Sequence, residues 1–416
     1  MKPRRARVVI VGGGFGGIYA AAYLSRSELA DRGLEITLID RKNYFTFTPL
    51  LAEVAAGALG REHLTYPYRV LARRYKTRFV QDAAEGLDLD RCFVKTRHTE
   101  IPYDYLILAT GAEPQYFGNE TIKQRSLPLT SVNCALAVRG QVMGSLERAV
   151  YTENEAERRR LLTFVVAGAG PAGVEIASAI HNLAGEVLDP YYGIRAPAKV
   201  ILAGADDRIL AAFDKDLARE GLARLRQRGV EVRLNTRITD IAAGVITAQG
   251  PGGYEQIQAR TLVWTAGMAP AQWLSQQELS TERGSLKIDP FLRVEGCENV
   301  FAIGDATMLR DERSGQPYPR VAPIAISQGV RAAANIENNV LGRSLEPYQA
   351  HHAGKIVSLG GGVALVDILG IQVRGIVAWW IYRLAYLLKL VGTKNKIRVL
   401  VTLILNRIFE PDLSYE

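Results

Sequence analysis

The chain has 416 residues, which at ~150 residues per domain predicts two or three domains. Apolar residues make up 48% of it and charged residues 23%, a composition that excludes a largely disordered or fibrous chain. Lys and Arg (51) outnumber Asp and Glu (43), giving a net charge of +8. This excess indicates a nucleic-acid or membrane partner only if the charges are clustered.

The cysteine and histidine contents argue against a metal centre. Cys92, Cys134 and Cys297 lie far apart and form no CxxC, which excludes a disulfide framework and a Cys-rich zinc or iron–sulfur site. The five histidines show no metal-ligand spacing. We therefore predict no metal and three reduced thiols in a cytosolic protein.

The first predicted unit of structure is a dinucleotide-binding fold at the N-terminus. A β-branched strand at 7–11 leads into GGGFGG and an alanine-rich helix, and a second strand at 35–40 ends in an acid. In GxGxxG the first glycine makes the turn, the second lets the backbone approach a pyrophosphate, and the third lets helix and strand pack closely. The strand-end carboxylate can accept hydrogen bonds from ribose hydroxyls. The predicted binding residues are Gly12, Gly14, Phe15, Gly16, Gly17 and Asp40.

The same pattern recurs in the middle of the chain. Strand 161–168 leads into GAGPAG and a helix at 174–185, and the next strand is expected at 199–204. The predicted binding residues of this second fold are Gly168, Gly170, Pro171 and Gly173. Two nucleotide folds in one chain imply two nucleotides, of which one is the redox partner of the other.

Three further strand ends add candidate cofactor contacts. Strand 104–112 ends in Ala109, Thr110 and Gly111, and its near-copy at 262–270 contributes Ala266 and Gly267. A short strand at 299–307 ends in Gly304 and Asp305. The aspartate and the neighbouring N–H groups can bind the ribityl or phosphate region of a flavin.

In this order, GGGFGG, Asp40, ATG, GAGPAG and Gly304-Asp305 resemble the flavoproteins with two dinucleotide-binding domains. The resemblance implies an α/β fold of two Rossmann-like domains, in which an NAD(P)H domain is inserted into an FAD domain. FAD is then expected on the first fold and Asp305, and NAD(P)H on the second. The expected boundaries are an FAD domain at 1–115 and 290–345, an NAD(P)H domain at 116–289, and a C-terminal amphipathic helical membrane-contact segment at 346–416.

Four segments resemble type II NADH dehydrogenases, the single-subunit, non-pumping NAD(P)H:quinone oxidoreductases: NYFTFTPLL (43–51), GAGPAGVE (168–175), WTAGMAP (264–270) and the C-terminal segment. The resemblance covers essentially the whole chain. It implies non-covalent FAD, NAD(P)H as the hydride donor and a membrane quinone as the two-electron acceptor. It also implies that Glu175 lies close to flavin and nicotinamide; the alternative is a glutamate that only positions its helix.

The chain departs from this family at the expected acceptor side. Family members carry Ala-Gln-x-Ala-x-Gln before the last helix of the FAD domain, whereas this chain has APIAISQG at 322–329. Pro323 and Ser327 stand where the glutamines fall. The residues expected on the quinone side are Phe45, Phe47, Pro49, Ala322, Pro323, Ala325, Ile326 and Gln328.

A second departure concerns the coenzyme. Strand 199–204 ends in Gly204, where NADH-specific relatives tend to have Glu or Asp. Without that carboxylate a 2′-phosphate is not repelled, and Arg208 is placed to bind it. We therefore expect NADPH to be used at least comparably to NADH. The alternative is that Asp206 or Asp207 replaces the missing acid.

The C-terminal segment predicts contact with a membrane surface. Its first apolar stretch is interrupted by Arg383 and Lys389 and falls short of the ~20 residues that a transmembrane helix needs. In the second, Lys394, Arg398, Thr402 and Asn406 form one polar stripe. Residues 374–409 carry seven cations and no acid, as expected for a helix pair lying peripherally on the anionic cytoplasmic leaflet. The alternative is packing on the body or across a homodimer interface.

Two other function classes remain open and a third is excluded. One is a soluble reductase that passes electrons to a ferredoxin-like protein, and the other is an FAD- and NAD(P)H-binding redox sensor with little turnover. Nucleic-acid binding is excluded because the basic stretches at 69–78 and 157–160 lack a helix-turn-helix context.

Overall fold

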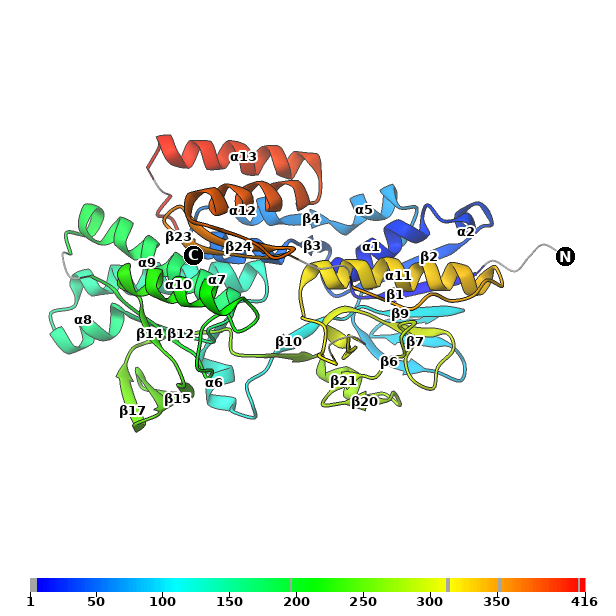
Figure 1. Cartoon of the computed structure of the whole chain (residues 1–416), viewed down its shortest axis with the longest axis horizontal. Coiled ribbons are helices and arrows are strands. Elements are labelled where there is room, and N and C mark those ends of the chain that lie inside the picture. Colours follow the sequence, from blue (N-terminus) through cyan, green and yellow to red (C-terminus); the bar gives the residue numbers. More distant parts are fainter. Residues whose placement is uncertain (1–5, 195–196, 312–314, 351–353, 411, 416) are drawn as a thin grey trace. The chain divides into compact units, whose positions relative to one another are not determined.

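A computed structural model of the chain describes residues 6–194, 197–311, 315–350, 354–410 and 412–415. The chain divides into two compact units. Unit 1 comprises Met1–Phe45, Tyr66–Glu113 and Met268–Ala353; unit 2 comprises Thr46–Thr65, Pro114–Gly267 and Gly354–Glu416 (Figure 1). Each unit is built around its own parallel sheet.

The sheet of unit 1 has five parallel strands in the order β22-β9-β1-β2-β5. In chain order they are β1 (Arg7–Val11), β2 (Glu35–Asp40), β5 (Arg78–Gln81), β9 (Tyr105–Leu108) and β22 (Val300–Ala302). The central strands are β-branched or leucine-rich and buried on both faces, as a doubly covered parallel sheet requires. The predicted dinucleotide fold is therefore confirmed in this unit.

Two helices pack together in unit 1, α1 (Phe15–Leu24) and α11 (Ala322–Val340). Their close approach depends on glycine, because a Cβ on Gly329 would lie 2.3 Å from the carbonyl oxygen of Gly16. From the sequence we expected the stretch at 322–329 to precede this last helix. In the structure it forms the first two turns of α11 instead. Pro323 allows this, since a proline in the first turn removes an N–H that has no helical partner.

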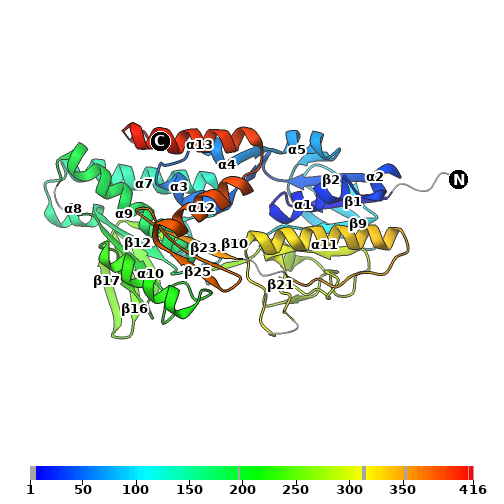
Figure 2. The same ribbon diagram turned by 45° about the horizontal axis from the view of Figure 1, so that its top comes forward.

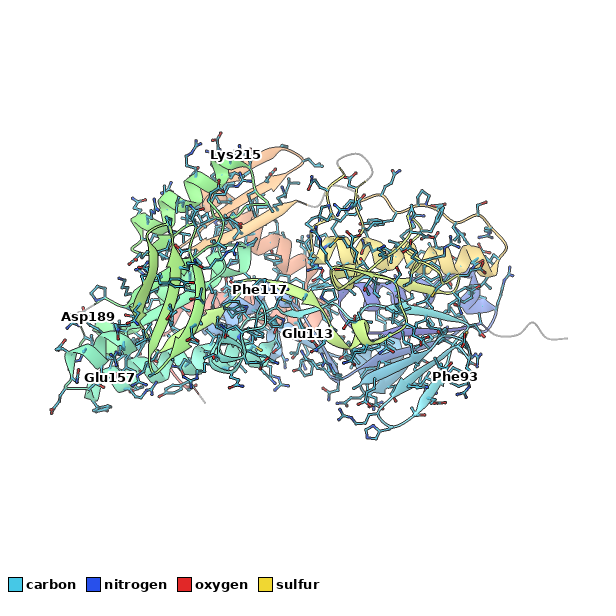
Figure 3. The ribbon with its side chains drawn as sticks, turned by 90° about the horizontal axis from the view of Figure 1, so that it is seen from below. Phe93, Glu113, Phe117, Glu157, Asp189 and Lys215 are labelled. Carbon is cyan, nitrogen blue, oxygen red and sulfur yellow. The ribbon has the colours of Figure 1, made fainter. Side chains whose placement is uncertain are left out.

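The rest of unit 1 consists of short elements around the sheet. A three-stranded antiparallel sheet contains β6 (Ala84–Asp88), β7 (Phe93–Thr96) and β8 (Glu100–Pro102), with Phe93 labelled in Figure 3. The remaining elements are α2 (Glu28–Asp31), β3 (Tyr44–Thr46), β4 (Thr65–Pro67), α5 (Tyr68–Arg74), β10 (Ala112–Pro114), β19 (Met268–Pro270), η2 (Gln272–Gln276), β20 (Thr281–Glu282), β21 (Ser285–Leu286) and η3 (Gly304–Ala306). The chain leaves unit 1 at β3 and re-enters it at β4.

Unit 2 repeats the parallel architecture with the strand order β11-β18-β12-β13-β14. The strands are β11 (Leu127–Pro128), β12 (Thr163–Ala167), β13 (Lys199–Ala203), β14 (Glu231–Arg233) and β18 (Thr261–Trp264). Helix α9 (Pro171–Tyr192) follows the glycine turn after β12 and has a proline at its first position. The second predicted Rossmann-like fold is confirmed.

Further helices and one antiparallel sheet complete the middle of unit 2. They are α6 (Glu120–Arg125), α7 (Val132–Tyr151), α8 (Glu155–Leu161), α10 (Lys215–Gln227), β15 (Arg237–Ala242), β16 (Val245–Gly250) and β17 (Gly253–Gln258). Glu157 on α8 and Lys215 on α10 are labelled in Figure 3.

The C-terminal part of unit 2 joins an antiparallel sheet to two helices. These are β23 (Lys355–Gly360), β24 (Val363–Ile368), β25 (Ile371–Arg374), α12 (Gly375–Lys389) and α13 (Thr393–Ile408). Figure 2 shows α13 running beside α12 and over the segment that contains η1 (Thr48–Leu50), α3 (Leu51–Ala55) and α4 (Arg61–Leu64). Among the described residues, no helix combines the length and apolarity needed to cross a membrane.

Candidate active site

The first glycine turn, in unit 1, has one glycine that borders open space, at the position where a phosphate would approach. Gly12 has φ +103°, and a Cβ there would lie 2.3 Å from the Ala109 carbonyl oxygen. A Cβ on Gly17 would lie 2.0 Å from the Gly12 oxygen. A Cβ on Gly14, by contrast, would meet no atom within 4 Å. Two glycines are thus required by packing, and the third borders free space at the N-terminus of α1, where anions bind.

Asp40 lies beside this turn as predicted, and its carboxylate already has protein partners. Its Oδ2 accepts a hydrogen bond from the Gly13 N–H (2.8 Å), and its Oδ1 accepts one from the Lys42 N–H (2.8 Å). The buried Tyr68 hydroxyl lies 2.7 Å from the Gly13 carbonyl oxygen and 3.3 Å from Asp40 Oδ2. Tyr68 therefore holds both the turn and the acid in place, a role the sequence did not reveal.

Two predicted cofactor contacts of unit 1, Thr110 and Asp305, follow strand ends. The Thr110 hydroxyl is buried and makes no hydrogen bond among the described residues. Asp305 follows β22 in a pocket that Tyr318, Arg320 and Gln328 also line, and burial raises the pKa of its carboxyl. Buried polar groups are normally hydrogen-bonded. These two positions therefore have unused capacity for a polar ligand.

The second glycine turn, in unit 2, repeats the geometry of the first. Gly168 has φ +106°, and a Cβ on Gly173 would lie 1.7 Å from the Gly168 oxygen. A Cβ on Gly170 would meet no atom within 4 Å. The Thr265 hydroxyl donates to the carbonyl oxygens of Ala167 (2.8 Å) and Gly168 (3.1 Å), which links this turn to the end of β18.

The predicted coenzyme-selectivity residues lie on the loop after β13. Gly204 is buried, and a Cβ there would lie 2.6 Å from the Cβ of Ala169 in the glycine turn. Arg208 is half-buried and donates to the Ala211 carbonyl oxygen at 2.8 Å, with no carboxylate partner among the described residues. Asp206 and Asp207 are exposed. After β18, Gly267 (φ +121°) lies beside Phe117, which Figure 3 labels, and Ala266 packs against the hydrophobic core of unit 2.

Glu175 lies on α9 in unit 2 and faces β23 and α12. Its Oε1 accepts a hydrogen bond from the Ser358 N–H at 3.0 Å. Burial raises the pKa of its carboxyl to about 8, against the opposing effect of the Ser358 bond. The negative charge of Glu53 raises this pKa further, whereas the Arg383 charge and the Tyr382 hydroxyl lower it. Glu175 is therefore largely protonated at neutral pH.

Aromatic rings of α12 border this carboxyl. Tyr382 is 1% exposed, and its ring centroid lies 4.7 Å from that of Tyr386. The Tyr386 ring in turn lies 6.0 Å from that of Phe47. Burial raises the pKa of both tyrosines, so both phenols stay neutral. Of the expected acceptor-side residues, Phe47 thus belongs to this cluster in unit 2, and Pro49 lies in η1 of the same unit.

The other expected acceptor-side residues lie in unit 1. Phe45 is 1% exposed and packs edge-on against Phe15 at 5.0 Å. Ala322, Pro323, Ala325, Ile326 and Gln328 lie in the first turns of α11. Gln328 is buried, and its side-chain oxygen accepts a hydrogen bond from the Gly304 N–H at 2.7 Å. Ser327, in place of a family glutamine, is 2.8 Å from the Tyr348 hydroxyl.

Comparisons with known proteins agree with this architecture. The pyridine nucleotide-disulphide oxidoreductase family model matches residues 6–329. A type II NADH:quinone oxidoreductase of Mycobacterium tuberculosis is 32% identical over 96% of this chain and 88% of its own length. The chain belongs to the type II NADH:quinone oxidoreductase family.

Two further similarities support this assignment. A type II NADH:quinone oxidoreductase of Staphylococcus aureus is 26% identical over 96% of this chain and 97% of its own length. The structure of NDH2 from Plasmodium falciparum in complex with NADH has the same fold, with a TM-score of 0.89 at 17% identity, covering 99% of this chain and all of that one. The family, fold and enzyme class predicted from the sequence are thereby confirmed.

Proposed function

We propose that the chain is an FAD-dependent enzyme that oxidises NAD(P)H and reduces a quinone of the respiratory chain without pumping protons. The observation that carries the proposal is the pair of glycine turns, each followed by a helix and each with one glycine bordering open space, in a chain of the type II NADH:quinone oxidoreductase family. When bound, FAD would supply the two-electron redox chemistry that links the coenzyme to the quinone.

The residues of unit 1 fit a non-covalently bound FAD. The N–H groups at the start of α1 and the space beside Gly14 suit a pyrophosphate, and Asp40 suits a ribose. The unpartnered hydroxyl of Thr110 and the carboxyl of Asp305, which lies near the charge of Arg320, suit the polar groups nearer the flavin ring. These groups would bind and orient the cofactor.

The residues of unit 2 fit a nicotinamide dinucleotide that carries or lacks a 2′-phosphate. Gly168, Gly170, Pro171 and Gly173 would hold the pyrophosphate at the start of α9. Arg208, with no carboxylate partner among the described residues, would bind the 2′-phosphate of NADPH. We therefore extend the donor from NADH to NADPH.

Glu175 is the proposed proton donor to the quinone. Reducing a quinone to a quinol takes two electrons and two protons, and the hydride supplies both electrons and one proton. The second proton must come from a protein group or water. A carboxyl group whose pKa burial raises to about 8 still holds its proton at neutral pH and can release it.

Helices α12 and α13 are the proposed membrane contact, on the cytoplasmic face. Two residues of the polar stripe of α13 contact the protein: Thr402 Oγ1 is 2.8 Å from His63 Nε2, and Asn406 donates to the Ala58 carbonyl oxygen at 2.8 Å. Lys394 and Arg398 of the same stripe are exposed. Ala378, Tyr382 and Val399 are buried, but many other apolar residues of the two helices are exposed: Ile376, Val377, Trp380, Leu384, Leu388, Ile397, Leu400, Val401, Ile404, Leu405 and Ile408. This polarity is the reverse of that expected for a helix facing water and suits a lipid surface.

The test is flavin reduction and reoxidation followed in the purified, FAD-loaded protein. Mixing with NADH or NADPH under anaerobic conditions should bleach the flavin, and a quinone analogue should restore it without a protein partner. Restoration by a ferredoxin-like protein but by no quinone would favour a soluble reductase. Slow formation of a charge-transfer complex without turnover would favour a redox sensor.

A further inference from the structure

The basic stretch at 69–78 lies in unit 1 and has no role in the function proposed above. Residues 63–81 contain no acidic residue and five cations: Arg69, Arg73, Arg74, Lys76 and Arg78. All five are exposed, and none has a carboxylate partner among the described residues. Like charges that are close together and unpaired repel one another and do not stabilise a fold. They favour a surface that binds an anionic partner.

Helix α5, labelled in Figure 2, places three of these cations on one face. Successive residues of a helix are about 100° apart, so four exposed residues fall within an arc of about 140°: Arg69, Val70, Arg73 and Arg74. Val70 is 49% exposed and lies within this arc. Tyr68 and Leu71 are buried on the opposite side of the helix. The outer face of α5 therefore combines three cations with one apolar side chain.

Arg26 of the same unit extends this face. The guanidinium carbons of Arg26 and Arg74 lie 6.0 and 5.9 Å from the centre of the Tyr75 ring. Arg26 is exposed and also has no carboxylate partner among the residues that the structure describes. We call this surface the α5 patch and define it by five residues: Arg26, Arg69, Val70, Arg73 and Arg74.

The composition of the α5 patch favours a lipid surface over a nucleic acid. A surface that binds single-stranded nucleic acid offers aromatic rings on which bases stack, but two guanidiniums already pack against the Tyr75 ring. The exposed Val70 also has no counterpart to contact on a phosphate backbone. At a membrane surface, by contrast, guanidiniums bind headgroup phosphates and apolar side chains enter the interface.

We propose that the α5 patch is a second contact with the anionic membrane surface, made by unit 1 and additional to helices α12 and α13 of unit 2. The proposal rests on the membrane contact proposed above for those helices. The order of the chain supports it. Asn395 of α13 donates to the Thr65 carbonyl oxygen at 2.9 Å, and α5 begins three residues later, at Tyr68. The segment that contacts α13 thus leads directly into the α5 patch.

The test is co-sedimentation of the FAD-loaded protein with vesicles of phosphatidylcholine, alone or mixed with phosphatidylglycerol. The variant Arg73→Gln/Arg74→Gln removes two charges of the α5 patch and keeps Arg69, whose guanidinium packs on the Phe79 ring. Each cation near an anionic surface strengthens binding about fivefold, so the partition coefficient on the anionic vesicles should fall roughly 30-fold. Partition onto phosphatidylcholine alone should stay unchanged, and the dependence of anionic binding on salt should become weaker.

The matched control is Lys95→Gln/Arg97→Gln on the antiparallel sheet of unit 1. It lowers the net charge by the same amount, but its two cations pair with Asp88 and Glu85. Its partition coefficient on the anionic vesicles should remain within a few-fold of wild type. The comparison therefore separates a local contact from the effect of net charge.

The outcomes also separate the α5 patch from the contact on which it rests. A wild-type protein that binds no anionic vesicle would overturn the contact of α12 and α13 together with the α5 patch. Equal partition of Arg73→Gln/Arg74→Gln and its control would overturn the α5 patch alone. Unchanged vesicle binding with a loss of binding to duplex DNA would overturn it in favour of a nucleic acid. Melting temperature and flavin content report folding; should the double variant not fold, Arg73→Gln decides, with an expected fall of about fivefold.

Discussion

The outward apolar face of α13 gives the prediction with the most direct structural basis. Ile397, Ile404 and Ile408 are 59%, 52% and 68% exposed. We consider their joint replacement by Gln, which preserves the helix and the net charge. Full burial of an isoleucine side chain contributes about 1.5–3 kcal/mol, so the exposed half of each contributes about 1 kcal/mol on entering a bilayer interface.

The three side chains together therefore contribute about 3 kcal/mol to membrane binding, which corresponds to a roughly 100-fold lower partition coefficient in the variant. Co-sedimentation with vesicles containing anionic lipid measures this coefficient. The matched control is Thr402→Ala/Asn406→Ala on the opposite face, which breaks the contacts to His63 and Ala58. This control should lower the melting temperature and leave the partition coefficient within a few-fold of wild type.

An unchanged partition coefficient in the Gln variant would refute this reasoning and favour packing of α12 and α13 in a homodimer, which sedimentation velocity would then detect. Of the seven cations of residues 374–409, Arg374 and Arg383 are paired with Glu220 and Glu53, and the other five have no carboxylate partner among the described residues. These five predict in addition that binding weakens with added salt and on neutral vesicles. Binding that is indifferent to lipid charge would contradict that part of the proposal.

Three further predictions concern the two nucleotide sites and Glu175. Gly14→Ala should fold normally, since its Cβ meets no atom within 4 Å, but the variant should lose FAD. Gly17→Ala should lower the melting temperature of the protein, because its Cβ would lie 2.0 Å from a carbonyl oxygen. Flavin content and thermal melts separate the two effects. Arg208→Gln should lower kcat/KM for NADPH about tenfold and leave that for NADH nearly unchanged; an equal loss with both coenzymes would argue against a 2′-phosphate contact. The pKa of Glu175 is raised from 4.5 to about 8 in the folded protein. The free energy of unfolding should therefore fall as the pH rises across that window, and Glu175→Gln should lack this dependence in denaturant titrations at each pH.

The local parts of the fold and site were predictable from the sequence because they depend on short-range constraints. A β-branched strand, GxGxxG and a helix form one continuous stretch. The atoms that exclude a side chain at Gly12 and Gly17 belong to this stretch itself and to the end of a neighbouring strand. Asp40 was predictable for the same reason, since a strand-end acid lies beside the turn of a Rossmann fold. The resemblance to a known family then supplied the order of the two folds.

The tertiary partners of these groups were not predictable. Tyr68 reaches the first turn from another helix, and Arg383 reaches Glu53 across 330 residues of sequence. Neither contact can be inferred from the neighbouring sequence, because the residue types alone do not say which distant residue a side chain will reach or whether the contact will be buried. The polar stripe of α13 was found from its spacing, but periodicity alone does not say which face meets the protein. In the structure, Thr402 and Asn406 contact His63 and Ala58 in the segment before β4.

The central claim is that one chain carries electrons from a nicotinamide coenzyme through a flavin to a quinone. Single-turnover stopped-flow measurement of the FAD-loaded protein tests it most directly, with the flavin reduced anaerobically by one equivalent of NADH and then mixed with a quinone analogue. We predict complete flavin reduction, followed by reoxidation whose rate rises with quinone concentration and yields one quinol per NADH. A flavin that NADH reduces but that stays reduced at every quinone concentration would contradict it.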